Sequence, residues 1–315
     1  MIGMSSDMRM QPSPSRTAVI TCLMRALHTK YDRPALIHDT WADRLVSAEE
    51  RNDLAAVVLG AIEPSNRDHL LAVGGADVIL HAAWRNRAVY GGVIIRTRYT
   101  EDTLKSAAQA GVRQYVIIGA GLDCFGVVPP EFARDVHVFE IDHPASQDLK
   151  RARLAVCGAA LPPTIHFVPA DLSKDELHAA LARSPFRFDQ PAILSWLGVT
   201  VYLTREANLA TLRSIGNFAA AGSQLVFTYI EERALHSSSP IMERARAYAA
   251  AIGEPWISGF DSATLPIELR ELGLEIIEDL GGQELRARYC ADRTDGFTPG
   301  KAGRIALAKV ARDDR

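Results

Sequence analysis

The chain has few cysteines and no two of them in a CxxC spacing. Its four cysteines are far apart and stand among apolar or small residues: Cys22, Cys124, Cys157 and Cys290. A disulfide framework or a zinc site needs paired or closely spaced cysteines, so neither is expected. We therefore predict reduced thiols, no metal site and a cytoplasmic protein.

The chain also lacks a strong excess of either charge and any long apolar run. The formal net charge of its 315 residues is -3, which provides no basic field for nucleic acid or anionic lipid. No apolar run reaches the roughly 18 residues of a membrane span, and the first residues lack the apolar core of a signal peptide. We expect a small molecule or a protein as the partner, with no nucleic acid and no membrane.

The hydrophobic pattern divides the chain into three parts. Residues 1–16, MIGMSSDMRMQPSPSR, are expected to form a disordered tail. Residues 17–98 have helical periodicity and no strand signal, which predicts an N-terminal helical cap. Residues 99–315 form the main domain, and Thr100 is expected to cap a helix that ends at Gly111.

Short apolar runs recur after that helix, with room for helices between them. They are QYVII at 114–118, VHVFEI at 136–141, TIHFVPA at 164–170, AILSWL at 192–197 and SQLVFTY at 223–229. This spacing predicts parallel strands whose crossover helices cover both faces of one sheet. The less regular segment 231–263 is expected to be a lid-like insertion over the site.

The end of the chain has little room for crossover helices. The segments GLEIIEDL, LRARYCAD and RIALAKVAR follow one another closely, so we expect them to pair antiparallel. The predicted fold class is α/β, with a mostly parallel sheet and an antiparallel C-terminal edge strand.

A glycine turn follows the first strand, in QYVIIGAGLDCFG. Gly119 and Gly121 allow the backbone to approach a ligand at the carboxyl end of the sheet. Asp142 follows about 20 residues later, at the end of the second strand, where an acid typically binds ribose hydroxyls. The pattern predicts an adenosine-type ligand. The simpler alternative is a tight turn, with Asp142 capping the strand end.

A dinucleotide fits this turn poorly. The third glycine of a G-x-G-x-x-G motif would fall at position 124, which is Cys124. That glycine brings a helix N-terminus close to a pyrophosphate. S-adenosylmethionine contains adenosine but no pyrophosphate, so it is favoured over a nicotinamide cofactor.

Six blocks, in order, resemble one family. They are RALHTKYDRPALIHDTWADRLV, RTRYTEDTL, QYVIIGAGLD, VFEIDHP, FVPADL and SWLGVTVYLT. They resemble the leucine carboxyl methyltransferase family, which includes protein phosphatase methyltransferases and bacterial carboxyl O-methyltransferases. The likeness covers about residues 17 to 230. It implies a Rossmann-like methyltransferase sheet with helices on both faces, S-adenosylmethionine as cofactor and S-adenosylhomocysteine as product.

The resemblance also implies roles for individual residues. Arg25 and Arg96 match basic residues that hold the methionine carboxylate of the cofactor, a contact suited to the two-pronged guanidinium. The other matches are the cofactor turn, the ribose-binding acid and the residues that line the adenine: Gly119, Ala120, Gly121, Asp142, Asp171 and Leu172. Without the resemblance, Arg25 and Arg96 read as solvated helix residues, and Asp171 as a helix cap.

The chain departs from the family at the end of the fourth strand. Family members often carry Glu where this chain has Leu197, so a carboxylate near the sulfonium or the substrate is missing. We expect Trp196 and Leu197 to lie beside the cofactor, with Trp196 offering an aromatic face to the cation. The segment CFGVVPPEFARD also replaces an arginine-containing turn.

The proposed chemistry requires few catalytic groups. A carboxylate is already ionised at neutral pH and needs no base, whereas a phenol does. The nine histidines show no spacing typical of a catalytic site, which favours O-methylation of a small-molecule carboxylate with no assigned catalytic residue. Tyr202, Tyr229 and Trp256 are candidates for the walls of the acceptor site. Two alternatives stay open: a catalytically silent methyltransferase-like binding module and a nicotinamide-dependent oxidoreductase.

Overall fold

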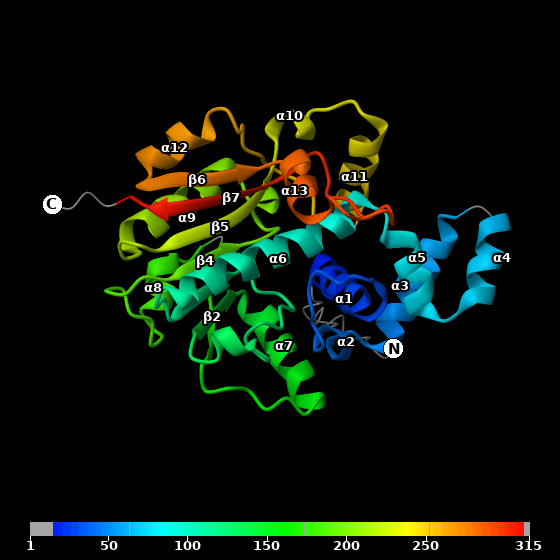
Figure 1. Cartoon of the computed structure of the whole chain (residues 1–315), viewed down its shortest axis with the longest axis horizontal. Coiled ribbons are helices and arrows are strands. Elements are labelled where there is room, and N and C mark those ends of the chain that lie inside the picture. Colours follow the sequence, from blue (N-terminus) through cyan, green and yellow to red (C-terminus); the bar gives the residue numbers. More distant parts are fainter. Residues whose placement is uncertain (1–14, 63, 173, 252, 312–315) are drawn as a thin grey trace, which may run out of the picture.

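The computed structural model describes residues 15–311 apart from 63, 173 and 252. The expected N-terminal tail lies outside the described residues, except for Ser15 and Arg16, which begin the first helix. The N-terminal part is helical, as predicted. Its helices are α1 (Arg16–Tyr31), α2 (Ala42–Leu45), α3 (Ala48–Gly60), α4 (Pro64–Val73) and α5 (Ala76–Trp84). Figure 1 shows α3, α4 and α5 gathered at one end of the molecule, away from the sheet.

A single long helix, α6 (Ala88–Gln109), joins the N-terminal helices to the sheet (Figure 1). The prediction that a helix begins at Thr100 is therefore wrong. The Thr100 hydroxyl donates to the carbonyl of Arg96 at 2.9 Å, a bond to the preceding helical turn, so this side chain lies inside a helix and caps nothing. The helix ends before Gly111, whose φ of 97° suits glycine.

The sheet contains the five predicted parallel strands in a doubly wound order. The parallel strands are β1 (Gln114–Ile118), β2 (His137–Asp142), β3 (Ile165–Pro169), β4 (Ile193–Trp196) and β5 (Gln224–Ile230). Two further strands, β6 (Leu274–Leu280) and β7 (Gly303–Val310), complete the sheet. Their spatial order is β3-β2-β1-β4-β5-β7-β6. The chain moves outward from β1 to β3 and then returns to the other side of β1, so the winding reverses beside β1. Ligands bind at such a reversal in open α/β sheets.

The antiparallel end of the sheet is confirmed, with one correction. The strand β7 runs antiparallel to both neighbours and lies between β5 and β6. The middle segment LRARYCAD is not a strand but belongs to helix α13 (Gly282–Tyr289). The Gly281 N–H donates to the Glu284 carboxylate at 3.0 Å, which closes the first turn, and Leu285 is the buried anchor of the helix.

The helices cover both faces of the sheet. The connecting elements are η1 (Glu131–Ala133), α7 (Pro144–Val156), α8 (Leu177–Leu181), η2 (Thr200–Tyr202), α9 (Arg205–Phe218), α10 (Glu232–Leu235), α11 (Pro240–Ala251) and α12 (Leu265–Glu271). Side chains of α6 pack with Tyr115 and Ile117 of β1. Side chains of α8, α9 and α12 pack with Val116 and Ile118 on the other face. The alternation of β1 thus divides the core into two layers.

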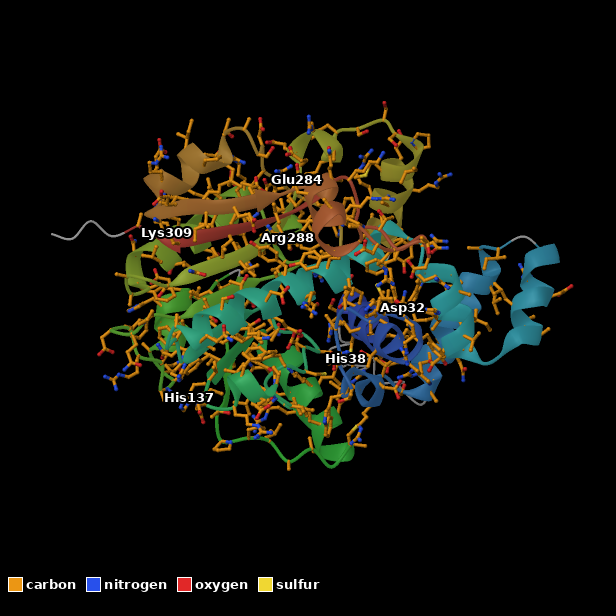
Figure 2. The ribbon with its side chains drawn as sticks, in the orientation of Figure 1. Asp32, His38, His137, Glu284, Arg288 and Lys309 are labelled. Carbon is orange, nitrogen blue, oxygen red and sulfur yellow. The ribbon has the colours of Figure 1, made fainter. Side chains whose placement is uncertain are left out.

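The predicted insertion 231–263 contains α10 and α11 and returns to the sheet at Phe260, which pairs with Glu231. Figure 2 places Asp32 among the N-terminal helices, and Lys309 and His137 in the region of the sheet. Within the described part of the chain, no helix is both long enough and apolar enough to cross a bilayer.

Candidate functional site

A cavity of about 410 Å³ lies at the carboxyl ends of β1 to β4, beneath the first turns of α1. Most of the residues predicted for the site line it. They are Arg25, Arg96, Gly119, Ala120, Gly121, Asp142, Asp171, Leu172, Leu197 and Tyr202. Its size is in the range of small-molecule and cofactor sites. Residues separated by more than 170 positions in the chain therefore meet at the reversal of the sheet.

The glycine turn presents bare backbone to this cavity. Gly119 and Gly121 have φ values of 73° and 51°, which other residues rarely adopt. A Cβ atom on Gly119 would lie 2.5 Å from Cγ2 of Val199, so no side chain fits there. The turn is held by the Gly119 N–H, which donates to the carbonyl of Ile141 at 2.8 Å.

Asp142, at the end of β2, stabilises the glycine turn through hydrogen bonds. Its Oδ2 accepts from the Gly121 N–H at 2.5 Å, and its Oδ1 accepts from the His143 N–H at 2.7 Å. Burial raises the pKa of Asp142, and these two backbone hydrogen bonds act against that rise. Each carboxylate oxygen can accept a second hydrogen bond, so the same side chain can hold the turn and bind a hydroxyl group.

Arg96 is the unusual charge of the site. In the described part of the chain its guanidinium makes no hydrogen bond or ion pair, although it lines the cavity beside Gly198. Its pKa is lowered to about 10, mainly by burial; Tyr202 acts to raise the pKa and Arg25 acts to lower it. A cation withdrawn from water without an anion is unfavourable. The cavity therefore contains a positive charge that a bound anion would compensate.

Arg25 differs from Arg96 because it is already paired. Its Nε donates to Asp39 at 2.9 Å, and its Nη2 donates to the carbonyl of Leu122 at 2.7 Å. Burial by itself would lower its pKa, but the neighbouring acid Asp39 reverses the effect and the pKa is raised. Arg25 thus holds α1 to the loop after β1. Only the part of its guanidinium that does not make these two hydrogen bonds is available to a ligand.

Asp171 and Leu172 line the cavity after β3. The Asp171 carboxylate accepts from Lys174 Nζ at 2.7 Å, and its backbone N–H donates to Asp175 at 2.8 Å. Asp171 therefore helps to organise the following turn while it borders the cavity. Its alternative interpretation as a helix cap is wrong, because the next helix, α8, begins at Leu177 and has Glu176 as its N-cap.

Three predicted site residues do not line the cavity. Trp196 is fully buried in the core layer of α9 and α12, because alternation along β4 directs Ser195 and Leu197 to the cavity instead. The prediction of an aromatic face for the cofactor is therefore wrong. Tyr229 is also buried, and its hydroxyl donates to Asp279 at 2.7 Å. The Trp256 side chain lies close enough to Tyr202, which does line the cavity, to lower the pKa of its phenol.

Sequence reasoning missed Glu254, which lines the cavity from the insertion. Its Oε1 accepts from the Ser15 hydroxyl at 2.5 Å, whereas its Oε2 is buried and has no hydrogen-bond partner in the described residues. This acid stands in the segment GEPWISGF at 253–260, and spacing along the chain does not reveal that residue 254 returns to the ends of the strands. Ser15, Thr17 and Thr21 of the α1 region line the cavity with it.

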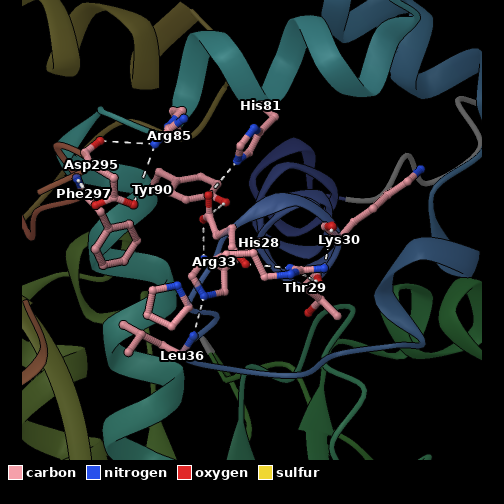
Figure 3. Close-up of polar contacts among 12 residues, drawn as sticks. His28, Thr29, Lys30, Arg33, Leu36, His81, Arg85, Tyr90, Asp295 and Phe297 are labelled. Carbon is pink, nitrogen blue, oxygen red and sulfur yellow. Dashed lines mark hydrogen bonds and ion pairs between the residues drawn. The ribbon is translucent and has the colours of Figure 1, made fainter. Parts of the chain in front are cut away.

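A buried polar cluster holds α1 in place (Figure 3). Asp32, just after α1, accepts from Tyr90 at 2.8 Å and pairs with His28 at 2.6 Å and His81 at 2.8 Å. The Leu36 N–H donates to His28 Nε2 at 2.8 Å, so the proton of His28 is assigned to Nδ1, which donates to Asp32. The cluster joins α1, α5 and α6, and so fixes the helix that covers the cavity.

No group of three or more His, Cys, Asp or Glu side chains is placed to hold a metal ion in residues 15–311, the three gaps aside. The histidines include one close pair on neighbouring strands, His137 of β2 and His166 of the edge strand β3, whose rings stack with centroids 5.2 Å apart. Neither lines the cavity.

Comparison with known proteins agrees with this geometry. The family model described as leucine carboxyl methyltransferase matches residues 18–216. A Bacillus subtilis protein named "Putative S-adenosyl-L-methionine-dependent methyltransferase YktD" is 30% identical over 286 residues, which cover 90% of this chain and 94% of that protein. A protein of the same description from Mycobacterium tuberculosis H37Rv, Rv3787c, is 31% identical over 230 residues, or 73% of this chain and 70% of that protein.

Among solved structures, a DUF574 family protein from Streptomyces avermitilis shares the fold with a TM-score of 0.56 and 16% identity, covering 94% of this chain and 97% of that one. The family match spans the glycine turn, Asp142 and Arg96, and S-adenosylmethionine, rather than a nicotinamide, is the cofactor of these relatives. The chain therefore belongs to the leucine carboxyl methyltransferase family and is an S-adenosylmethionine-dependent methyltransferase.

Proposed function

We propose that this enzyme transfers the methyl group of S-adenosylmethionine to a carboxylate of a small molecule, with the cofactor bound in the cavity at the glycine turn. The observation that carries the placement of the cofactor is Arg96, a half-buried cation without a partner in the described residues, in the same cavity as Gly119 and Asp142. The carboxylate of the methionine part would compensate Arg96. Asp142 would accept from the ribose hydroxyls, and Asp171 and Leu172 would border the adenine.

The bound cofactor supplies a methyl group on a positively charged sulfur. The residues of the chain bind and orient the cofactor and the acceptor, and they keep water out of the site. The bare glycine turn allows close approach of the ligand, and α1 covers the cavity, so the reacting groups would be aligned in a site with little water.

The groups around the cavity favour an acceptor that is already ionised. Burial raises the pKa of Tyr202, so its phenol keeps its proton and is no base at neutral pH. His143 begins α7, and its Nδ1 accepts from the Ala145 N–H at 3.2 Å, which commits that nitrogen to the helix. A carboxylate is a weak base toward a phenol, whose ordinary pKa is about 10. Methylation of a carboxylate needs no base.

The test is the chemical stability of the product. Purified protein is incubated with methyl-labelled S-adenosylmethionine and a low-molecular-mass cell extract, and the labelled product is treated with mild alkali. A methyl ester releases volatile labelled methanol, which is the expected result. Label that resists alkali would show an ether or an amine product and overturn the carboxylate proposal. Absence of any transfer, with the cofactor bound, would favour the silent binding module.

A further inference from the structure

The end of the cavity near β4 contains two charges of opposite sign that are incompletely satisfied. Arg96 has no partner in the described chain, and Oε2 of Glu254 is buried without a hydrogen bond there. The other oxygen of Glu254 is held by Ser15 at 2.5 Å, so the carboxylate is positioned and not freely mobile. A buried acceptor without a donor is uncommon in proteins and calls for an explanation.

Tyr202 lies near both charged side chains. Burial raises its pKa, Glu254 raises it further, and Arg96 lowers it. The phenol is thus within electrostatic reach of both side chains. All three residues line one cavity, on the side of β4, while Asp142 and Asp171 line it after β2 and β3.

A cation and an anion beside one phenol match a zwitterion. In the methionine part of the cofactor the carboxylate and the ammonium are attached to the same carbon atom. If Arg96 compensates the carboxylate, the ammonium needs an acceptor close by. Leu197 lines the cavity after β4 but is apolar, so it cannot provide one.

We propose that Glu254 binds the ammonium group of the methionine part of the cofactor. This inference rests on the proposed placement of the cofactor in the cavity. A carboxylate with one oxygen already held by Ser15 is oriented before the ligand arrives, which favours tight binding. The insertion 231–263 then contributes directly to the cofactor site.

Two ligands that differ only at this group test the proposal. They are S-adenosylhomocysteine and its desamino analogue, 5'-(3-carboxypropylthio)adenosine, in which hydrogen replaces the amino group. We expect the unaltered protein to bind S-adenosylhomocysteine roughly 10-fold more tightly than the analogue, because the analogue leaves Glu254 unpaired. Equal affinities of the unaltered protein for both ligands would overturn the proposal without any variant.

The variants Glu254→Gln and Glu254→Asp should weaken binding of S-adenosylhomocysteine by roughly 10-fold and binding of the analogue by less than about 2-fold. The matched control is Glu243→Gln, an exposed acid on α11 of the same insertion, which should change neither. Equal weakening of both ligands by the Glu254 variants would mean general damage to the lid and would overturn the proposal.

A failure of the underlying placement gives a different result. If Asp142→Ala leaves both affinities unchanged, the cofactor does not lie at the glycine turn. If Asp142→Ala weakens both ligands but the Glu254 variants do not change their ratio, the placement holds and only the role of Glu254 is wrong.

Discussion

Arg96 on α6 lies directly against Gly198 at the end of β4, so close that a Cβ atom at position 198 would collide with the guanidinium. Gly198 also has a φ of 69°, and its N–H donates to the Thr228 hydroxyl at 2.7 Å. The loop after β4 and the long helix thus meet at a point where any side chain at position 198 would have to displace the end of the Arg96 side chain.

The Gly198→Ala variant should displace the Arg96 side chain and weaken binding of S-adenosylhomocysteine about 10-fold, a loss of about 1.4 kcal/mol by calorimetry. The control is Gly158→Ala. Gly158 has a nearly equal φ of 68° but nothing within 4 Å of a new Cβ, so it reports the backbone strain without the collision. Similar losses in both variants would show that strain, and not Arg96, is responsible.

Replacing Arg96 by Ala should weaken S-adenosylhomocysteine by about 2 kcal/mol or more, because the methionine carboxylate loses its charged partner. Adenosine has no such tail, so its affinity should hardly change. Arg96→Lys should recover only part of the loss, because the forked contact is absent. Lys105→Ala, which removes an exposed cation from the same helix, is the control. Equal losses for the two ligands would assign Arg96 a structural role.

Arg96 should lower the stability of the ligand-free protein, although it strengthens ligand binding. Arg96→Met removes a half-buried charge that has no partner in the described residues, so the thermal unfolding temperature of the ligand-free protein should rise. Added S-adenosylhomocysteine should then raise that temperature less than in the unaltered protein. A lower unfolding temperature of the ligand-free variant would contradict this view of the site.

Asp142→Ala should weaken the binding of S-adenosylhomocysteine and of adenosine alike, by about 1.5 to 3 kcal/mol, because it removes the acceptor for the ribose and the hydrogen bond to Gly121.

Binding of adenosine should also depend on pH. Since burial raises the pKa of Asp142, the carboxylate is lost at a higher pH than an ordinary aspartate, and affinity should fall as the pH is lowered toward that raised value. Calorimetry of Asp142→Asn over the same range should show no such fall.

Asp32 should stabilise the fold above acid pH. Burial alone would raise its pKa, but hydrogen bonds from His28, His81 and Tyr90 lower it, so the stabilisation is present above the ordinary value of about 3.9 and is lost as the pH falls below it. Urea unfolding at pH 7 should show that Asp32→Ala loses about 3 to 5 kcal/mol, and this difference should shrink below about pH 4. Asp148→Asn, an exposed acid on α7, should cause no loss at either pH.

Several features of the fold could be predicted because they depend on neighbours in the chain. The runs that form β1 to β5 are apolar and closely bounded, and the cap of α9 is also local, because the Thr204 side chain accepts from the Ala207 N–H at 3.2 Å. The predictions of a helix cap at Thr100 and of a strand at LRARYCAD are wrong, because the local sequence does not distinguish a threonine within a helix from a cap, or a short polar helix from a strand. Tertiary packing decided both.

The site shows the same division. The sequence by itself determined that a small-residue turn, an acid at the end of β2 and two arginines were present in the order of one methyltransferase family. Only the tertiary structure decided that Arg25 is paired with Asp39 while Arg96 is not, that Trp196 faces the core, and that Glu254 reaches the cavity. The physical reason is that burial and charge compensation depend on which groups meet in space, and residues from α1, α6, the strand ends and the insertion meet only once the sheet has formed.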